Sequence, residues 1–158
     1  MEKILISACL LGAKVRYDGR DALVMRPALR RWADEGRLVA VCPEQMGGLP
    51  TPRPAAELVE SNGRIRVVTA AGDDVSRFYE EGARQALAAA AQHGARIAVL
   101  KDRSPSCGSS VVYDGTFGGR ETAGEGLTTA ALRRAGVRVF SEREIDNAAA
   151  YLDEIERR

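Results

Sequence analysis

Four short, continuous apolar runs constrain the fold of this chain most strongly. A segment with a helical pattern of apolar residues follows each run. The runs are rich in Ile, Leu and Val and cover residues 3–9, 37–42, 96–100 and 137–140. An unbroken apolar run of this length is typical of a strand that is buried on both faces of a parallel sheet. Helices that alternate with such strands cover both faces of that sheet. We therefore predict an α/β, Rossmann-like fold with a mainly parallel sheet flanked by helices.

The segments between and after these strands carry the helical patterns. Apolar side chains recur every three or four positions there, and Pro, Asp, Ser or Gly residues mark the ends. The predicted helices run from Pro27 to Gly36, from Asp73 or Asp74 to Gly94, from residue 127 to Gly136, and onward from a capping box at Ser141 and Glu144. With 158 residues, against roughly 100–200 for a typical domain, the chain is expected to form one domain over residues 1–158.

Three further segments are predicted to be turns or loops. Asn62-Gly63 and Asp114-Gly115 are turn pairs that predict two hairpins, the second joining residues 111–113 to residues 116–117. Residues 43–57 contain four prolines, which exclude a regular helix interior or strand ladder. We expect a long, stiff loop there.

The charge balance argues against several classes of partner. The chain has 23 basic and 22 acidic residues and a net charge of +1, so no overall field attracts it to nucleic acid or anionic lipid. Aromatic residues make up 5% of the chain, too few for the usual base-stacking sheet. No apolar run approaches the roughly 18 residues of a membrane span. We therefore expect neither a stable nucleic-acid complex nor a membrane partner.

The first residues resemble the end of a lipoprotein signal, with Ile6-Ser7-Ala8 before Cys9. Only eight residues precede Cys9, however, which is too short for a signal core and its cleavage site. We interpret this segment as the first buried strand. The chain is then expected to be cytoplasmic, where thiols stay reduced.

The three cysteines all follow predicted strands. Cys9 ends the first strand, Cys42 ends the second, and Cys107 lies just beyond the third. Each one alone is most simply interpreted as a small buried hydrophobic residue. The carboxyl ends of parallel strands, however, meet at the edge of the sheet where ligands bind. We therefore expect the three sulfur atoms to converge on a common centre at that edge.

Three cysteine thiols at one edge of the sheet favour an iron–sulfur cofactor over a zinc ion. A structural zinc site needs four ligands, and the only histidine, His93, lies near the end of the long predicted helix, at the wrong end of the following strand. The same separation excludes a Cys–His nucleophilic pair. Three thiolates without a fourth protein ligand suit a cubane iron–sulfur cluster in which one iron keeps an open position.

Five short motifs carry a family resemblance: Ser7-Ala8-Cys9-Leu10-Leu11-Gly12, Arg16-Tyr17-Asp18-Gly19, Cys42-Pro43-Glu44, Gly47-Gly48-Leu49-Pro50-Thr51-Pro52-Arg53, and Ser104-Pro105-Ser106-Cys107-Gly108. Together they resemble the bacterial 2-thiouracil desulfidase (desulfurase) family, over about residues 4 to 140. The resemblance implies a 4Fe-4S cluster on Cys9, Cys42 and Cys107. It further implies that the sulfur of a thiolated pyrimidine binds the open iron, and that hydrolysis yields uracil and sulfide without net redox change.

The resemblance also implies roles for residues near the cysteines. The family's catalytic carboxylate and serine match Glu44 and Ser104. Glu44, two residues after Cys42, would be the general base, and Ser104 would orient the pyrimidine or water, or supply the attacking oxygen. Ser106 and Arg53 are candidates for hydrogen bonds to the substrate or to a sulfide of the cluster. Asp102 departs from the small polar residue expected there and is predicted to affect the substrate range.

Two other functions fit parts of the sequence. A sulfur-trafficking protein or one related to tRNA thiolation would use the same cluster, although the near-neutral charge disfavours a large tRNA surface. A non-enzymatic nucleotide-binding module with incidental cysteines is the other alternative. That module would lack both the G-x-G-x-x-G fingerprint after the first strand and a Walker lysine.

Overall fold

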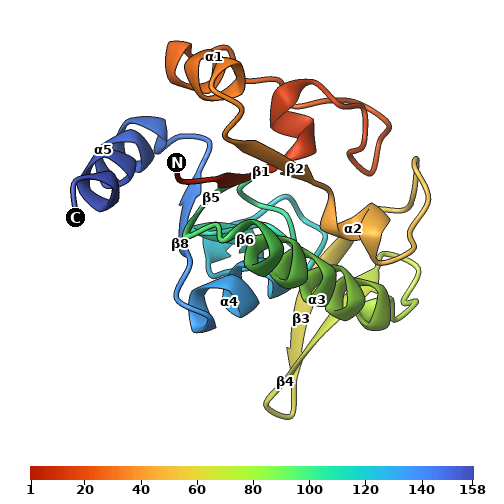
Figure 1. The fold of residues 1–158 in the computed structure, drawn as a ribbon. Coiled ribbons are helices and arrows are strands. Elements are labelled where there is room, and N and C mark those ends of the chain that lie inside the picture. The colour runs from red at the N-terminus through yellow and green to blue at the C-terminus, as the bar shows by residue number, and fades with distance from the viewer.

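A four-stranded parallel sheet forms the centre of the computed structural model, which describes residues 1–158. Its strands occur in the order β2-β1-β5-β8 (Figure 1). They are β1 (Ile4–Ser7), β2 (Leu38–Val41), β5 (Ile97–Leu100) and β8 (Arg138–Ser141). All three pairings are parallel, with Ile4 opposite both Leu38 and Ile97. The predicted α/β fold with a parallel sheet is confirmed.

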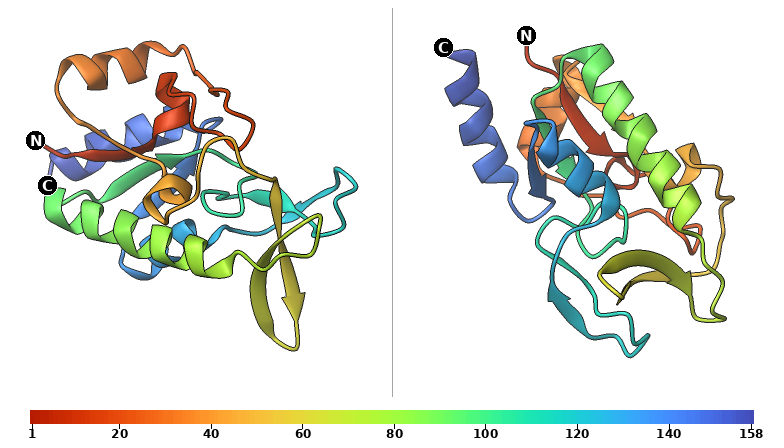
Figure 2. Two further views of the ribbon diagram at one scale, coloured as in Figure 1. Left: turned by 90° about the vertical axis from the view of Figure 1, so that its right-hand side faces the viewer. Right: turned by 90° about the horizontal axis from the view of Figure 1, so that it is seen from below.

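Helices cover both faces of the sheet, because side chains along a strand alternate between the two faces. Ile4 and Ile6 pack with α1 (Pro27–Asp34) and α5 (Ile145–Glu156) on one face. Leu5 packs on the other face with α3 (Ser76–His93) and α4 (Leu127–Arg134). Figure 2 shows the two helix layers on opposite sides of the strands. This burial on both faces explains why the strand sequences are continuously apolar.

One of the two predicted hairpins is confirmed. In the other, the first strand pairs with a different segment from the one predicted. β3 (Ala56–Ser61) and β4 (Arg64–Thr69) flank Asn62-Gly63 as predicted. β6 (Val111–Tyr113) pairs with β7 (Glu121–Ala123) and not with residues 116–117. The carboxylate of Glu57 accepts hydrogen bonds from the amides of Gly115 and Phe117 at 2.9 and 3.1 Å, so these residues form a wider loop.

Two short helices directly follow β1 and β2. The first is the 3₁₀ helix η1 (Ala8–Leu11), and the second is the single turn α2 (Pro43–Met46). The prediction of a long loop over residues 43–57 is therefore wrong at its start, and also at its end, because β3 begins at Ala56. Pro43 occupies the first helical position, where a proline costs no hydrogen bond. None of the helices is long and apolar enough to span a bilayer.

Two glycines bring α2 against the backbone of α3. A Cβ atom added at Gly47 would lie 1.9 Å from the carbonyl oxygen of Phe78. One added at Gly82 would lie 2.0 Å from the carbonyl oxygen of Pro43. Such distances are far inside van der Waals contact, so only glycine allows α2 to pack this closely. The contact fixes the residues that follow Cys42 relative to α3.

Gly82→Ala is therefore expected to destabilise the protein by about 1–3 kcal/mol through overpacking. This outcome opposes helix propensity, which favours Ala over Gly by roughly 0.5–1 kcal/mol. Urea denaturation of the metal-free protein measures the effect. The exposed Ala88 of the same helix supplies the control, because Ala88→Gly reports propensity alone. A Gly82→Ala protein more stable than the wild type would contradict the packing argument.

Candidate functional site

A cavity of about 400 Å³ opens at the carboxyl ends of β1, β2 and β5. This is the edge of a parallel sheet at which ligands bind. Six of the seven predicted site residues line it: Cys9, Cys42, Glu44, Arg53, Ser104 and Cys107. Residues that lie up to 98 positions apart in the sequence thus share one cavity. Its volume falls in the range typical of small-molecule sites.

The three cysteines reach the cavity from three different segments. Cys9 lies in η1, Cys42 precedes α2, and Cys107 lies in the loop between β5 and β6. All three are free thiols; Cys9 and Cys107 are buried, and Cys42 is half-buried. Each segment begins at a strand end, so the parallel sheet itself brings the thiols to one edge.

Burial keeps the three thiols in their neutral form. Burial and the neighbouring Cys42 raise the pKa of the Cys9 thiol to about 11. Burial likewise raises the pKa of Cys42 and of Cys107. A metal centre that takes these side chains as thiolates must therefore displace their protons.

Glu44 lies in α2 and has two carboxylate oxygens with different surroundings. Oε1 accepts hydrogen bonds from the Tyr79 hydroxyl at 2.7 Å and from Arg53 Nε at 3.0 Å. Oε2 lies 3.4 Å from the Ser104 hydroxyl. Tyr79 and Arg53 therefore fix the carboxylate, and the second oxygen remains directed at Ser104.

Tyr79 was not identified as a site residue from the sequence, where it is one of the apolar positions of α3. Its side chain is 2% exposed, and the only available signal was that a buried tyrosine hydroxyl needs a partner. Burial and the adjacent Glu44 carboxylate raise the pKa of Tyr79, so its hydroxyl stays protonated and can donate.

Arg53 is positioned mainly by protein groups. Besides Glu44, its guanidinium donates to the carbonyl oxygens of Pro50 and Val15 at 3.1 and 2.9 Å, and to the hydroxyl of Thr51 at 3.0 Å. These contacts use four of the five N–H donors of an arginine, and leave one on Nη2. The predicted hydrogen bond from Arg53 to a substrate would have to come from that donor.

Ser104 links Glu44 to Cys107 through its hydroxyl. The oxygen accepts hydrogen bonds from the amides of Ser106 and Cys107, both at 3.0 Å. Its own hydrogen is then free to point to Glu44 Oε2. The serine thus combines a turn-forming role with a position on the cavity wall.

Ser106 is the one predicted site residue that the structure does not place at the cavity. Its side chain is fully buried, and its hydroxyl lies 2.8 Å from that of Thr128 in α4. The residue faces away because its hydroxyl is bound on the α4 side of the loop. His93 is exposed at the end of α3 and does not line the cavity either.

Basic side chains complete the wall, and each has a carboxylate partner. Lys101 pairs with Glu142 at 2.7 Å, and Arg103 pairs with Glu121 at 2.7 Å. Arg16 lies 3.5 Å from Asp18. The cavity therefore combines thiols and apolar surface with balanced charges.

Comparison with known proteins finds, over most of the chain, the same family that the sequence motifs resemble. The family model for 2-thiouracil desulfurase matches residues 4–144. The protein YbbK of Bacillus subtilis (strain 168) is 43% identical over 150 residues, which cover 91% of this chain and 98% of YbbK. The solved structure of the 4Fe-4S-dependent thiouracil desulfidase TudS is 48% identical, with a TM-score of 0.92, over 97% of this chain and 99% of TudS. The chain belongs to the 2-thiouracil desulfurase family.

Proposed function

We propose that this protein is a desulfidase that removes the sulfur atom of a thiolated pyrimidine such as 2-thiouracil. The products are uracil and sulfide, and the cofactor is a 4Fe-4S cluster held by Cys9, Cys42 and Cys107. The observation that carries the proposal is the shared cavity of three thiols and the Glu44–Ser104 pair. Membership of the family and the similarity to TudS support it. Because the whole site depends on one sheet, we further propose that residues 1–158 act as a single domain.

The donor set fits an iron–sulfur cluster. Three free thiols from separate strand ends, around a cavity, suit a cofactor with several iron atoms. When bound, such a cluster supplies a thiophilic iron with an open position, which accepts the sulfur of a C=S group and makes that sulfur a better leaving group.

Glu44 acts as the general base in this proposal. A water molecule adds its oxygen to the carbon that carries sulfur, and Glu44 Oε2 accepts the proton that the water loses. The carbon–sulfur bond then breaks as the hydroxyl on that carbon becomes the carbonyl of uracil. The sulfur leaves with the bonding electron pair and takes the hydroxyl proton as hydrosulfide, and Glu44 releases its proton to solvent. Oxygen replaces sulfur at an unchanged oxidation level, so the step needs no electron donor or acceptor.

Ser104 orients the reacting groups. Two amides hold its oxygen in place and its hydroxyl faces Glu44, so it can align either the water or a polar edge of the pyrimidine. The remaining Nη2 donor of Arg53 supplies one further contact to a pyrimidine oxygen.

The proposed function is tested by anaerobic reconstitution with iron and sulfide. After the iron content is measured, the holoprotein is incubated with 2-thiouracil and other thiobases. Uracil is measured by chromatography and released sulfide by a colorimetric assay, and the two are expected in equal amounts. Metal-free protein is the control. A fully loaded protein that releases no sulfide from any thiobase would overturn the proposal.

Tyr79→Phe is expected to lower kcat about tenfold while KM changes less than about twofold. The variant removes one hydrogen bond to the Glu44 carboxylate, and a hydrogen bond to a charged group is worth roughly 1.5–3 kcal/mol. Steady-state kinetics with equal iron loading measure the effect. Tyr151→Phe is the matched control, because Tyr151 lies in α5 and packs against Phe140.

Two further results bear on this role of Tyr79. In a Glu44→Gln background, Tyr79→Phe should reduce kcat much less, because the group it positions is already gone. A Tyr79→Phe protein that loses its iron would instead assign the tyrosine to the cofactor site.

A further inference from the structure

We infer that Asp102 is a positioning residue that holds Cys107 and Ser104 at the cavity through the backbone of their loop. We call residues 101–111 the cysteine loop. The inference rests on the proposed function only where it treats Cys107 as a cluster ligand.

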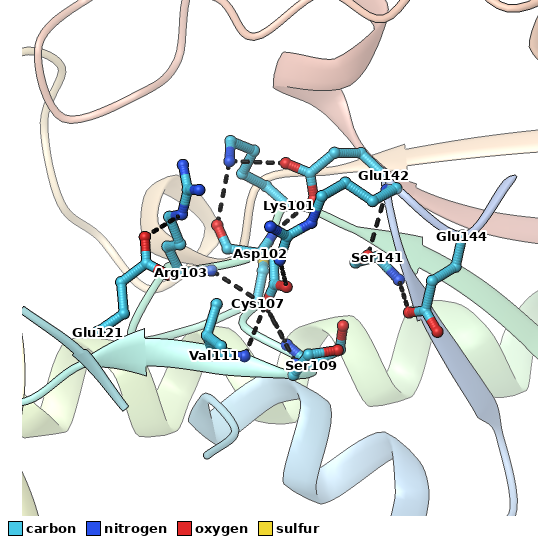
Figure 3. Close-up of polar contacts among 12 residues, drawn as sticks. Lys101, Asp102, Arg103, Cys107, Ser109, Val111, Glu121, Ser141, Glu142 and Glu144 are labelled. Carbon is cyan, nitrogen blue, oxygen red and sulfur yellow. Dashed lines mark hydrogen bonds and ion pairs between the residues drawn. The ribbon is translucent and has the colours of Figure 1, made fainter. Parts of the chain in front are cut away.

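One carboxylate oxygen of Asp102 gathers the amides of the cysteine loop. Oδ1 accepts hydrogen bonds from Arg103, Ser109, Ser110 and Val111 at 3.1, 3.0, 3.1 and 3.2 Å. Figure 3 shows the amides of Arg103, Ser109 and Val111 converging on the carboxylate. The first of them lies at the start of the loop and the other three at its end, so the carboxylate closes the loop behind Cys107.

The other side of Asp102 is tied to the turn after β8. Oδ2 forms an ion pair with Arg143 at 2.6 Å, and the Asp102 amide donates to Glu142 Oε1 at 2.8 Å. Lys101 strengthens the link through its ion pair with Glu142 (Figure 3). These contacts fix the position of the loop relative to the sheet.

The backbone beside Asp102 needs this support. Arg103 adopts φ 73°, a left-handed conformation that is unfavourable for a residue with a side chain. Its amide is held by Asp102 Oδ1 and by the carbonyl oxygen of Val111 at 3.0 Å. The strained residue directly precedes Ser104, so release of Arg103 would move the serine first.

The carbonyl groups of the cysteine loop have a separate set of partners. At the start of α4, the amides of Leu127 and Thr128 donate to the carbonyl oxygens of Pro105 and Ser106 at 3.0 and 2.9 Å. The Thr129 hydroxyl donates to the Cys107 carbonyl oxygen at 2.9 Å. Helix α4 therefore binds carbonyl groups in the middle of the loop, while Asp102 binds amides at the two ends of the loop.

Asp102 lines the cavity, but its carboxylate is not free to contact a substrate. Its side chain is 1% exposed, and five donors occupy its two oxygens. Burial opposes its ionisation, but the amides of Ser110, Val111 and Ser109 outweigh that effect and lower the pKa of Asp102. The carboxylate is thus committed to loop geometry, and the predicted effect of Asp102 on the substrate range would act through the cysteine loop.

The test measures cysteine reactivity in the metal-free protein, so it does not depend on activity or on a cluster. Reduced apoprotein is pulsed with iodoacetamide under native conditions, and the three cysteines are followed by peptide mass spectrometry. In Asp102→Ala, Cys107 should react at least about tenfold faster than in the wild type, while the equally buried Cys9 is unchanged. Cys42, which is half-buried, is the internal reference.

Two variants control for the chemistry of the side chain. Asp102→Asn keeps an oxygen that can accept the four amide hydrogen bonds but loses the charge, so Cys107 should react only about threefold faster. Arg143→Gln removes only the ion pair with the exposed Arg143 side chain. It leaves the amide contacts and the hydrogen bond to Glu142, so its Cys107 should react at the wild-type rate. A chelator should remove iron from the reconstituted variants in the same order: fastest from Asp102→Ala, more slowly from Asp102→Asn, and slowest from Arg143→Gln.

The outcomes separate loop positioning from general stability. Equal acceleration at all three cysteines in Asp102→Ala would show a global loss of structure and overturn the inference. If Asp102→Ala does not fold, Asp102→Asn decides: selective exposure of Cys107 supports the inference, and wild-type rates overturn it. A protein that binds no cluster but shows selective exposure of Cys107 would refute the proposed function and leave the role of Asp102 standing.

Discussion

Replacing Glu44 with Gln is expected to lower kcat by roughly 10²–10⁴-fold, the usual contribution of a general base. The amide keeps the size of the side chain and can still accept hydrogen bonds from Tyr79 and Arg53. It cannot take a proton from water. Because no thiol is altered, the protein should bind as much iron as the wild type and keep the brown colour of a cluster.

The measurement pairs iron content with steady-state sulfide release. Glu60→Gln on the exposed side of the β3–β4 hairpin is the matched control and should behave as the wild type. A colourless Glu44→Gln protein would make Glu44 a cluster ligand. A brown protein with full turnover would place the base elsewhere.

Replacing any one of Cys9, Cys42 or Cys107 with Ser is expected to abolish both the cluster and the activity. A hydroxyl is a harder and more weakly binding ligand for iron than a thiolate, and the site offers no fourth cysteine to substitute. Iron should fall from roughly four atoms per chain to background after reconstitution. Ser is close to Cys in size, so the metal-free proteins should still fold.

Iron and sulfide analysis, together with the visible spectrum, follows the loss, and circular dichroism reports the fold. Ser61→Ala in the β3–β4 hairpin is a control for handling and reconstitution. A single cysteine variant that retains iron and turnover would remove that residue from the ligand set and leave a cluster with another arrangement.

The parallel sheet was predictable because its signal is local. Ile4, Ile6 and the corresponding residues of β5 form continuous apolar runs, and these runs result directly from burial on both faces. The location of the site was predictable from the same runs, because the carboxyl ends of parallel strands lie at one edge of the sheet. The arrival of Cys9, Cys42 and Cys107 at one cavity therefore needed only their position relative to the strands.

The remaining features depend on contacts between distant segments, which periodicity does not encode. Tyr79 follows the apolar rhythm of α3, and only its hydroxyl, 2.7 Å from Glu44, distinguishes it from a core residue. Glu57 changes the pairing of β6 by binding two amides of the following loop. For Asp102 the sequence indicated only an effect on the substrate range, and its hydrogen-bond partners, which include amides up to nine residues away, were not predictable from it.

The pairing of β1 with β5 has a consequence for the order in which the protein assembles during synthesis. β1 can pair with β2 soon after Leu38 emerges, which brings the segments of Cys9 and Cys42 together early. β1 can pair with β5, opposite Ile97, only after that residue has been synthesised, and long-range pairing of this kind is slow. The cysteine loop is fixed later still, because its partners include Leu127 and Arg143. In a nascent chain the segments of Cys9 and Cys42 therefore come together before that of Cys107 is fixed. We expect the cluster to load only after residues 127–143 have left the ribosome.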